Sequence, residues 1–327
     1  MTVDKVDLPG LTVRHLRYFV AVAQEHSFTK AAQRLLVAQQ GVSDQVRQLE
    51  QNLDVRLFER SSRRVELTAA GEVFLAETVG LLAQLDRAVD RTRSVHRDAT
   101  RRVRIGFGEG AALTLTEPIL EAMRARHPDV HIELRQFNYD DPSVGLGHGS
   151  VDVGLLRLPV STPGLTVERL FAEPVVVACA ASHPLAQRSD VSVRELLSEP
   201  LLGSATDDAA WNAFWQLEEF RDGAPAPVVS RSTTLLEELA KVLAGVGVVV
   251  TAAAARWVPI PGIVYVPISD APASVVAVAV RADRATALAQ SFVEVCRRVR
   301  DENPELIAML ESASATEPPW TVDNPNP

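Results

Sequence analysis

The chain has 327 residues, 46% of them hydrophobic, which is enough for about two domains with buried cores. Its two cysteines, Cys179 and Cys296, lie far apart, so neither a disulfide framework nor a zinc site is expected. No apolar run reaches the roughly 18 residues that span a membrane, and the N-terminus lacks the hydrophobic segment of a signal peptide. We therefore expect a cytoplasmic protein without a metal or cofactor.

The net charge of -9 is unevenly divided along the chain. Residues 11–70 carry nine Lys or Arg against six Asp or Glu, and residues 86–104 carry seven Arg against three Asp. The first 104 residues together carry +4, which leaves -13 for the remainder. Because DNA phosphates attract positive charge and repel negative charge, DNA binding is expected only from the N-terminal part.

Residues 27–53 predict two short helices separated by a tight turn at Val37 and Ala38. Ser27 can cap the first helix. Its buried stripe would comprise Ala31, Ala32, Leu35 and Leu36. The second helix runs from about Gln39 to Leu53 and turns four apolar residues inward, namely Val42, Val46, Leu49 and Leu53. Its polar N-terminal half is then free to face the major groove of DNA.

A hairpin is predicted directly after the second helix, with strands from Val55 to Phe58 and from Arg64 to Leu67. Each element alone would be more typical of core packing or of a solvated face, but their order indicates a winged helix-turn-helix. Basic side chains at a hairpin tip can hold phosphates on either side of the groove. The candidate DNA-binding residues are Thr29, Gln39, Gln40, Ser43, Asp44, Arg47, Arg60, Arg63 and Arg64.

The chain resembles the LysR-type transcriptional regulators over almost its whole length. The matching segments are LRYFVAVA at 16–23, SFTKAA at 27–32, Leu53, LFER at 57–60 and LTAAG at 67–71. The resemblance places the helix-turn-helix motif on residues 28–47. Gln40 departs from the family's usual proline and Asp44 from its usual basic or polar residue, so the usual operator contacts cannot be assumed. Asp54 replaces a glycine, which is tolerable because Asp can adopt a left-handed conformation.

A long helix from about Ala69 to Val95 is predicted next, with Thr68 as its cap. It carries a short heptad seam of Leu75, Leu82, Leu85 and Val89, with Thr78 and Thr92 as weaker members. The helix could lie on its own domain, but pairing with a second subunit is favoured because one winged helix spans only about one half-site. The resemblance implies the same linker helix and a homodimer or homotetramer.

From Val103 onward, short apolar runs alternate with helices, which predicts a parallel α/β fold. The expected strands are 103–107, 130–135, 151–156, 175–180, 201–203, 228–230, 248–251 and 275–280. The expected helices are 113–126, 211–220, 235–244 and 285–300, with a shorter segment at 141–148. The resemblance implies two lobes, similar to periplasmic ligand-binding proteins, with a small-molecule inducer between them.

The predicted organisation is a winged helix-turn-helix domain at 11–70, a linker helix at 71–98 and an effector domain at 101–302. Lobe I would comprise 103–174 and 272–302, and lobe II 175–271. Residues 303–327 are rich in proline and are expected to be disordered.

Ligands in open parallel sheets sit beyond the carboxyl ends of strands, which selects the turns after these runs. The candidate effector-binding residues are Glu109, Gly110, Ala111, Asn138, Arg157, Thr206 and Thr234. Arg157 could equally be a surface cation. Family inducers are often carboxylates, yet Glu109 stands where a small hydroxyl residue is common, so Glu109 would pair with Arg157 or favour a ligand that carries an amine.

The sequence thus predicts a sequence-specific regulator that is not an enzyme. Its expected partners are operator DNA and a small-molecule effector such as a carboxylate or an amino acid, and RNA polymerase could be another. Two alternatives remain open: a sequence-blind architectural DNA-binding protein and a dinucleotide-binding enzyme. The enzyme alternative depends on the glycines of GFGEG at 106–110, which lack the third glycine at the required offset.

Overall fold

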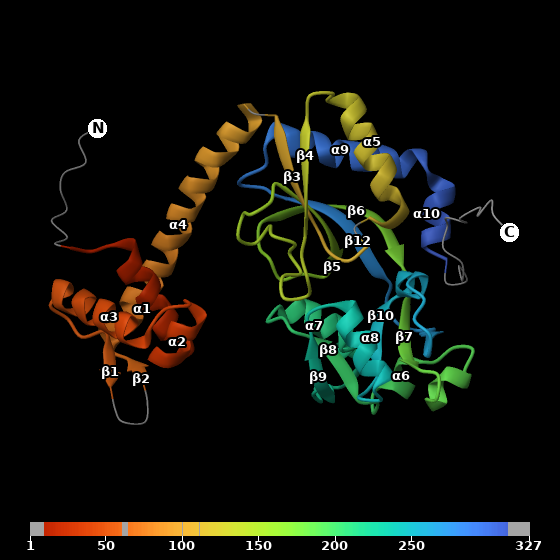
Figure 1. Ribbon diagram of the computed structural model, residues 1–327, viewed down its shortest axis with the longest axis horizontal. Helices are drawn as coiled ribbons and strands as arrows, with labels where there is room; N and C mark the ends of the chain where they lie inside the picture. Colours follow the sequence, from red (N-terminus) through yellow and green to blue (C-terminus); the bar gives the residue numbers. More distant parts are fainter. Residues whose placement is uncertain (1–9, 61–64, 100, 111, 313–327) are drawn as a thin grey trace. The chain divides into compact units, whose positions relative to one another are not determined.

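The computed structural model describes residues 10–60, 65–99, 101–110 and 112–312. The chain divides into two compact units, Met1–Arg93 and Ser94–Pro327, and each is described by itself. The N-terminal unit contains α1 (Val13–Glu25), α2 (Phe28–Arg34), α3 (Gln39–Leu53), β1 (Phe58–Arg60), β2 (Val65–Leu67) and the start of α4 (Ala69–Ala99) (Figure 1).

The first three helices pack around one apolar core that includes Phe19, Val22 and Leu49. Ser27 caps α2 by accepting a hydrogen bond from the backbone N–H of Lys30. Ala31 and Ala32 are buried between the helices, as their small size predicts. The prediction that Leu36 belongs to the same buried stripe is wrong. Helix α2 ends at Arg34, and Leu36 takes a positive φ of 54° in the turn and is 92% exposed.

The wing follows α3. Asp54 ends this helix in the left-handed conformation that the sequence predicts for it. The Glu50 side chain accepts hydrogen bonds from the backbone N–H groups of Leu57 and Phe58, at 2.9 and 3.1 Å. These bonds fix the entry into β1, which pairs antiparallel with β2. The predicted tip residues Arg63 and Arg64 lie outside the described residues.

Helix α4 begins after Thr68, whose hydroxyl accepts a hydrogen bond from the N–H of Gly71. Leu75, the first member of the predicted seam, packs against the core of its own domain. Farther along, Leu82 is half-buried, whereas Leu85 and Val89 are 38% and 40% exposed. Helix α4 therefore presents apolar side chains to solvent well beyond the core of the N-terminal unit.

Lobe I of the C-terminal unit is a five-stranded sheet in the order β4-β3-β5-β12-β6. Its strands are β3 (Arg102–Phe107), β4 (His131–Gln136), β5 (Val153–Leu158), β6 (Leu165–Glu173) and β12 (Ser274–Arg281). Its helices are η1 (Leu113–Leu115), α5 (Thr116–Arg126), α9 (Ala287–Glu302) and α10 (Pro304–Leu310). Helices α5 and α9 lie together over the sheet and bury its apolar side, including Ile105, Ile119 and Phe292 (Figure 1).

Lobe II contains a three-stranded sheet, β10-β7-β11, and a two-stranded sheet, β8-β9. Its strands are β7 (Val175–Ala180), β8 (Leu201–Ser204), β9 (Val228–Ser232), β10 (Val249–Ala252) and β11 (Ile263–Pro267). Its helices are η2 (Pro184–Gln187), α6 (Val193–Leu196), α7 (Ala209–Trp215), η3 (Glu218–Phe220), α8 (Leu235–Leu243) and η4 (Ala253–Trp257). Strand β7 pairs antiparallel with both of its neighbours, so the three-stranded sheet is antiparallel. In lobe I β12 pairs antiparallel with β5 and β6, whereas β3 pairs parallel with β4 and β5, so that sheet is mixed. The prediction of a purely parallel fold is therefore wrong.

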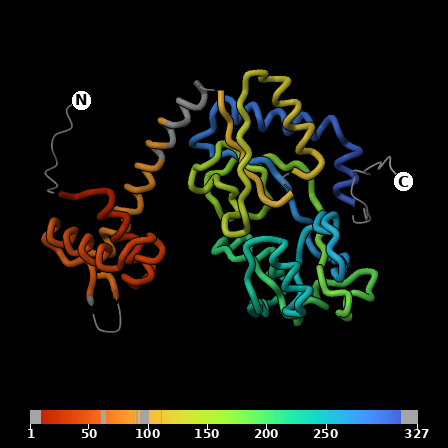
Figure 2. Tube along the Cα trace, viewed as in Figure 1, coloured from red at the N-terminus to blue at the C-terminus, as the bar shows by residue number. Residues whose placement is uncertain are grey.

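The chain passes between the lobes twice (Figure 2). The first passage leads from β6 to β7 through Pro174, and the second leads from β11 to β12. The two passages lie side by side at the lobe boundary, because Glu173 and Ser274 are register partners in the β6–β12 pair.

Two segments differ from their prediction. Residues 141–148 form successive turns instead of a helix, because the Asp141 carboxylate accepts hydrogen bonds from the N–H groups of Ser143 and Gly145 and from the Ser143 hydroxyl. The expected disordered tail begins with helix α10, in which Leu310 is only 3% exposed. Residues 313–327 lie outside the described part of the chain.

Both cysteines are free and buried, and burial raises the pKa of each thiol. Within the described residues, no helix combines the length and the apolar character needed to cross a membrane.

Candidate functional site

The N-terminal half of α3 presents a polar face outside the domain core. Gln39, Gln40, Asp44 and Arg47 are exposed, Ser43 is half-buried, and Thr29 is exposed on α2. Val42 and Val46, between them, are fully buried, so helical periodicity fixes the outward direction of the polar residues. Arg60 ends β1, and its side chain is not among those described.

Asp44 and Arg47 form an ion pair on this face, with 2.9 Å between the Asp44 Oδ1 and the Arg47 Nη1. Both side chains are at least half exposed, so the pair adds at most about 1 kcal/mol to stability. Both residues are predicted to bind DNA, and in this pair Asp44 neutralises the positive charge that Arg47 would offer to DNA.

The C-terminal unit encloses a cavity of about 420 Å³ between its lobes. Lobe I contributes the turns after β3 and β4 and the end of β5, and lobe II contributes β8, the start of α8, β10 and η4. Four of the predicted effector residues line it: Glu109, Gly110, Asn138 and Arg157. This volume falls within the range usual for small-molecule sites.

Thr206 and Thr234 were predicted in the same site, but neither is among the described residues that line the cavity. The Thr206 hydroxyl accepts a hydrogen bond from the N–H of Asp208, and the Thr234 hydroxyl caps α8 by accepting from the N–H of Glu237. Both hydroxyls are therefore used to build turns. Ala111 lies outside the described residues.

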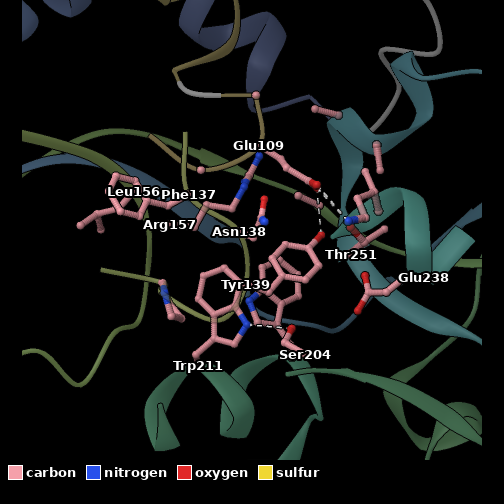
Figure 3. Close-up of a pocket in the computed structure, with 18 of the residues that line it drawn as sticks. Glu109, Phe137, Asn138, Tyr139, Leu156, Arg157, Ser204, Trp211, Glu238 and Thr251 are labelled. Atoms are coloured by element: carbon pink, nitrogen blue, oxygen red, sulfur yellow. Dashed lines mark hydrogen bonds between the residues drawn. The ribbon is translucent and has the colours of Figure 1, made fainter. Parts of the chain in front are cut away.

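The Glu109 carboxylate spans the cavity from lobe I to lobe II (Figure 3). Its two oxygens lie 3.0 and 3.1 Å from the backbone N–H of Leu235 at the start of α8, and the Tyr139 hydroxyl donates to it at 3.2 Å. Burial raises the pKa of Glu109, and these two hydrogen bonds only partly oppose the increase.

Arg157 does not pair with Glu109, contrary to one expectation. Its guanidinium lies 2.7 Å from the Glu173 carboxylate and donates to the Ser274 hydroxyl at 3.2 Å. The side chains of Arg157 and Glu173 are 16% and 2% exposed, so this is a buried ion pair rather than a surface cation. Glu173 also accepts a hydrogen bond from the N–H of Ala254 in lobe II. Arg157 thus binds both chain passages at the lobe boundary.

The turn after β4, which strand-end geometry selects, contains Tyr139, whereas Glu238 and Trp211 were missed at the sequence level. Tyr139 is half-buried and Glu238 is buried, both beside Glu109, and burial raises the pKa of both well above the usual values. Trp211 donates from its indole nitrogen to the Ser204 hydroxyl at 3.0 Å, and its ring lies 6.0 Å from that of Tyr139. The burial of Glu238 was predictable, because Glu238 lies on the same face of α8 as the buried residues Leu239 and Val242.

The lobes are also joined outside the cavity. Ser161 of lobe I donates its N–H and its hydroxyl to the Asp208 carboxylate, both at 2.8 Å, and its hydroxyl accepts from the N–H of Ala210. The N–H of Tyr139 donates to the carbonyl of Thr233 at 2.8 Å. These bonds set the distance between the lobes and hence the width of the cavity.

The fold and the cavity together define a class, the transcriptional regulators that couple a winged helix-turn-helix domain to a small-molecule-binding domain. Residues 13–72 match the family model of the bacterial regulatory helix-turn-helix proteins of the lysR family, and residues 96–301 match the LysR substrate binding domain. The chain therefore belongs to the LysR-type transcriptional regulators, which have a DNA-binding domain followed by an effector-binding domain.

Individual relatives agree with this assignment. The transcriptional regulator BenM of Acinetobacter baylyi is 32% identical over 88% of this chain and 96% of its own length. HcaR, the Hca operon transcriptional activator of Escherichia coli, is 40% identical, but the match spans 57% of this chain and 62% of HcaR. The crystal structure of full-length BenM covers 90% of this chain and 98% of its own, with 30% identity and a TM-score of 0.50.

Proposed function

We propose that this chain binds operator DNA as an oligomer and changes its regulatory output when a small molecule occupies the cavity between its lobes. The observation that carries the proposal is the separation of two sites: a polar face on α3 in the N-terminal unit and a 420 Å³ cavity in the acidic C-terminal unit. We assign the winged domain to residues 11–70, the linker helix to 71–98 and the effector domain to 101–302.

In this proposal Thr29, Gln39, Gln40 and Ser43 read base edges, and the wing arginines Arg60, Arg63 and Arg64 hold phosphates. The exposure of the α3 residues and their direction away from the core support the first assignment. Arg47 is ion-paired with Asp44, so a contact of Arg47 with a phosphate or a guanine would compete with this pair.

Oligomerisation would use the apolar residues of α4 beyond the domain core. Leu82, Leu85 and Val89 recur at helical spacing and are half-buried or exposed in a single chain. A second copy of the helix would bury them, and a two-fold dimer would place two winged domains on a palindromic operator.

We propose that the cavity binds its ligand without catalysis and that the protein acts in the cytoplasm, where its DNA target lies. The glycines of the 106–110 segment support binding without a dinucleotide. A side chain at Gly106 would overlap the backbone carbonyl of Val144, and Gly110 has a φ of +81°. Close packing and a turn therefore account for these two glycines.

Footprinting on DNA upstream of the chain's own gene and its neighbours, compared with random DNA, tests the proposal. Gln40→Ala should relax specificity at one base pair by about 1–3 kcal/mol. The control Gln48→Ala replaces an exposed glutamine in the C-terminal half of α3 and should change little. Arg63→Ala should weaken binding to all sequences alike and lower the salt slope by about one unit.

Equal protection of operator and random DNA would favour an architectural protein and contradict specific recognition. Nicotinamide cofactors should neither bind nor turn over. An unchanged affinity and salt slope for Arg63→Ala would remove the wing from the proposed interface.

A further inference from the structure

The cavity contains two features that ordinarily bind anions, and the chain's own carboxylates already occupy both. The first is the N-terminus of α8, where free N–H groups and the helix dipole favour a negative charge. Glu109 reaches this position from the opposite lobe and accepts the N–H of Leu235 with both oxygens, at 3.0 and 3.1 Å. A ligand carboxylate would have to displace Glu109 to bind there.

The second feature is Arg157, whose positive charge is neutralised by Glu173 at 2.7 Å. Glu173 is 1% exposed and belongs to the strand pair at the lobe boundary, so it cannot move aside without opening the core. Arg157 therefore has little net attraction left for an anionic ligand.

The negative groups in the cavity, by contrast, are only partly compensated: the charge of Arg157 acts on Glu109 and the charge of Lys241 acts on Glu238. Glu238 lines the cavity and is 3% exposed, and neither it nor Glu109 forms an ion pair with a cation of the described residues. The charge of Lys241 acts on Glu238, but the Lys241 ammonium is held by Glu237 at 2.8 Å and by the carbonyl of Arg231 at 2.6 Å. Burial raises the pKa of Glu109 and of Glu238, as expected for carboxylates without sufficient compensation.

The rest of the cavity wall is largely aromatic and aliphatic. Tyr139, Trp211 and Trp215 form a connected group, with ring centroids 6.0 and 5.6 Å apart, and Phe137 and Trp257 also line the cavity. Such faces bind apolar groups and also attract cations through their ring quadrupoles.

We propose that the effector of this chain carries a protonated amine, bound between Glu109 and Glu238, on an apolar body that contacts the tryptophans. The inference depends on the proposed function of the cavity as the effector site, and it specifies the class of ligand. Because Arg157 forms its ion pair with Glu173, the proposal takes up the other alternative raised by Glu109, a ligand that carries an amine.

Matched probes test this inference on the full chain by isothermal titration calorimetry. The probes share phenyl, indole or isobutyl bodies and end in an ammonium, a carboxylate or a neutral amide, as in 2-phenylethylamine, 3-phenylpropanoate and 3-phenylpropanamide. We expect amines to bind and the carboxylates of the same bodies to bind at least about tenfold more weakly. A panel in which no amine binds, or in which carboxylates bind as tightly, overturns the proposal.

Variants then assign the binding to the two carboxylates. Glu238→Gln should weaken amine binding by roughly tenfold to a hundredfold, because a charged hydrogen bond becomes a neutral one. The control Glu219→Gln replaces an exposed glutamate outside the cavity lining and should leave the affinity unchanged. Equal amine affinity in Glu238→Gln and the wild type contradicts the assignment.

Glu109→Ser gives the reverse test, because it frees the N–H of Leu235 at the start of α8. This variant should lose amine affinity and gain affinity for 3-phenylpropanoate. Its folding is checked by circular dichroism and by operator binding, and Glu109→Gln gives a second variant of nearly equal size. A folded Glu109→Ser protein that still prefers amines would refute the inference that Glu109 excludes ligand carboxylates from the start of α8.

The two levels of inference fail in different ways. Carboxylates that bind and alter the operator footprint would leave the proposed function standing and remove only the amine. If the wild-type protein without any probe protected operator and random DNA equally, the proposed function would be contradicted, whereas the calorimetric result would be unaffected.

Discussion

Replacing Arg157 by alanine should destabilise the effector domain by about 3–5 kcal/mol, because it leaves the Glu173 carboxylate buried without its cation. The structure supports a value in this range, since the side chains of Glu173 and Arg157 are 2% and 16% exposed, so solvent screens the pair only weakly. The loss of the hydrogen bond to Ser274 adds to the same cost.

Guanidinium unfolding followed by tryptophan fluorescence measures this change in one domain. The winged domain at 11–70 contains no tryptophan, whereas Trp211, Trp215 and Trp257 lie in the C-terminal unit, so the signal does not report on the winged domain. Arg126→Ala is a matched control, because Arg126 and Glu294 form an ion pair of 2.8 Å with side chains 42% and 55% exposed. It should cost no more than about 1 kcal/mol.

The double variant Arg157→Met with Glu173→Leu separates the charge from the packing. Removing both charges should recover most of the stability lost in Arg157→Ala, since no buried carboxylate remains. A loss below about 1 kcal/mol in Arg157→Ala, or a double variant less stable than Arg157→Ala, would refute the reasoning. Operator binding without effector should persist, because the winged domain is a separate unit.

Three further predictions follow from the two units. Asp44→Ala frees Arg47 from its ion pair, so we expect stronger non-specific DNA binding and a salt slope steeper by about one unit, measured by anisotropy titration. Leu82→Glu should weaken the dimer by a few kcal/mol in sedimentation velocity, whereas Ala83→Glu, an exposed neighbour, should not; an intact Leu82→Glu dimer would place the interface elsewhere. Burial and the negative charges of Glu109 and Glu237 raise the pKa of Glu238 above 4.5, and the positive charge of Lys241 only partly opposes the increase. The folded state therefore binds this proton more tightly than the unfolded state. Stability should therefore fall as pH rises from about 4.5 to the raised value, by at most about 1.4 kcal/mol per pH unit, and Glu238→Gln should flatten that slope.

The sequence predicted elements whose pattern is local. Strand β7, predicted as 175–180, has those bounds because a continuous run of apolar residues is buried on both faces. Strand β6 was missed, because it is an edge strand in which Glu168 and Arg169 interrupt the apolar pattern. Helix α10 was missed because proline suggested a break, whereas Pro304 occupies the first turn of the helix, where its missing N–H costs nothing.

The chemistry of the cavity was predictable only in part. Strand-end geometry indicated Glu109, Asn138 and Arg157, and all three line the cavity. The partner of Arg157 was not predictable, because Glu173 lies at the end of the missed strand and reaches Arg157 only through the pairing of β5, β12 and β6. The predicted threonines do not line the cavity for a different reason, since turns and caps use the same hydroxyl groups that ligands do.

The double passage of the chain between the lobes also constrains how the domain is made. Strand β12 lies between β5 and β6, so lobe I lacks an internal strand until residue 281 has been synthesised. Arg157 and Ser274, which meet at the boundary, are 117 positions apart. Contacts so distant in sequence form slowly, whereas every strand of lobe II lies within the intervening segment. We therefore expect lobe II to become protected first during synthesis and lobe I to complete its sheet only after β12 emerges from the ribosome.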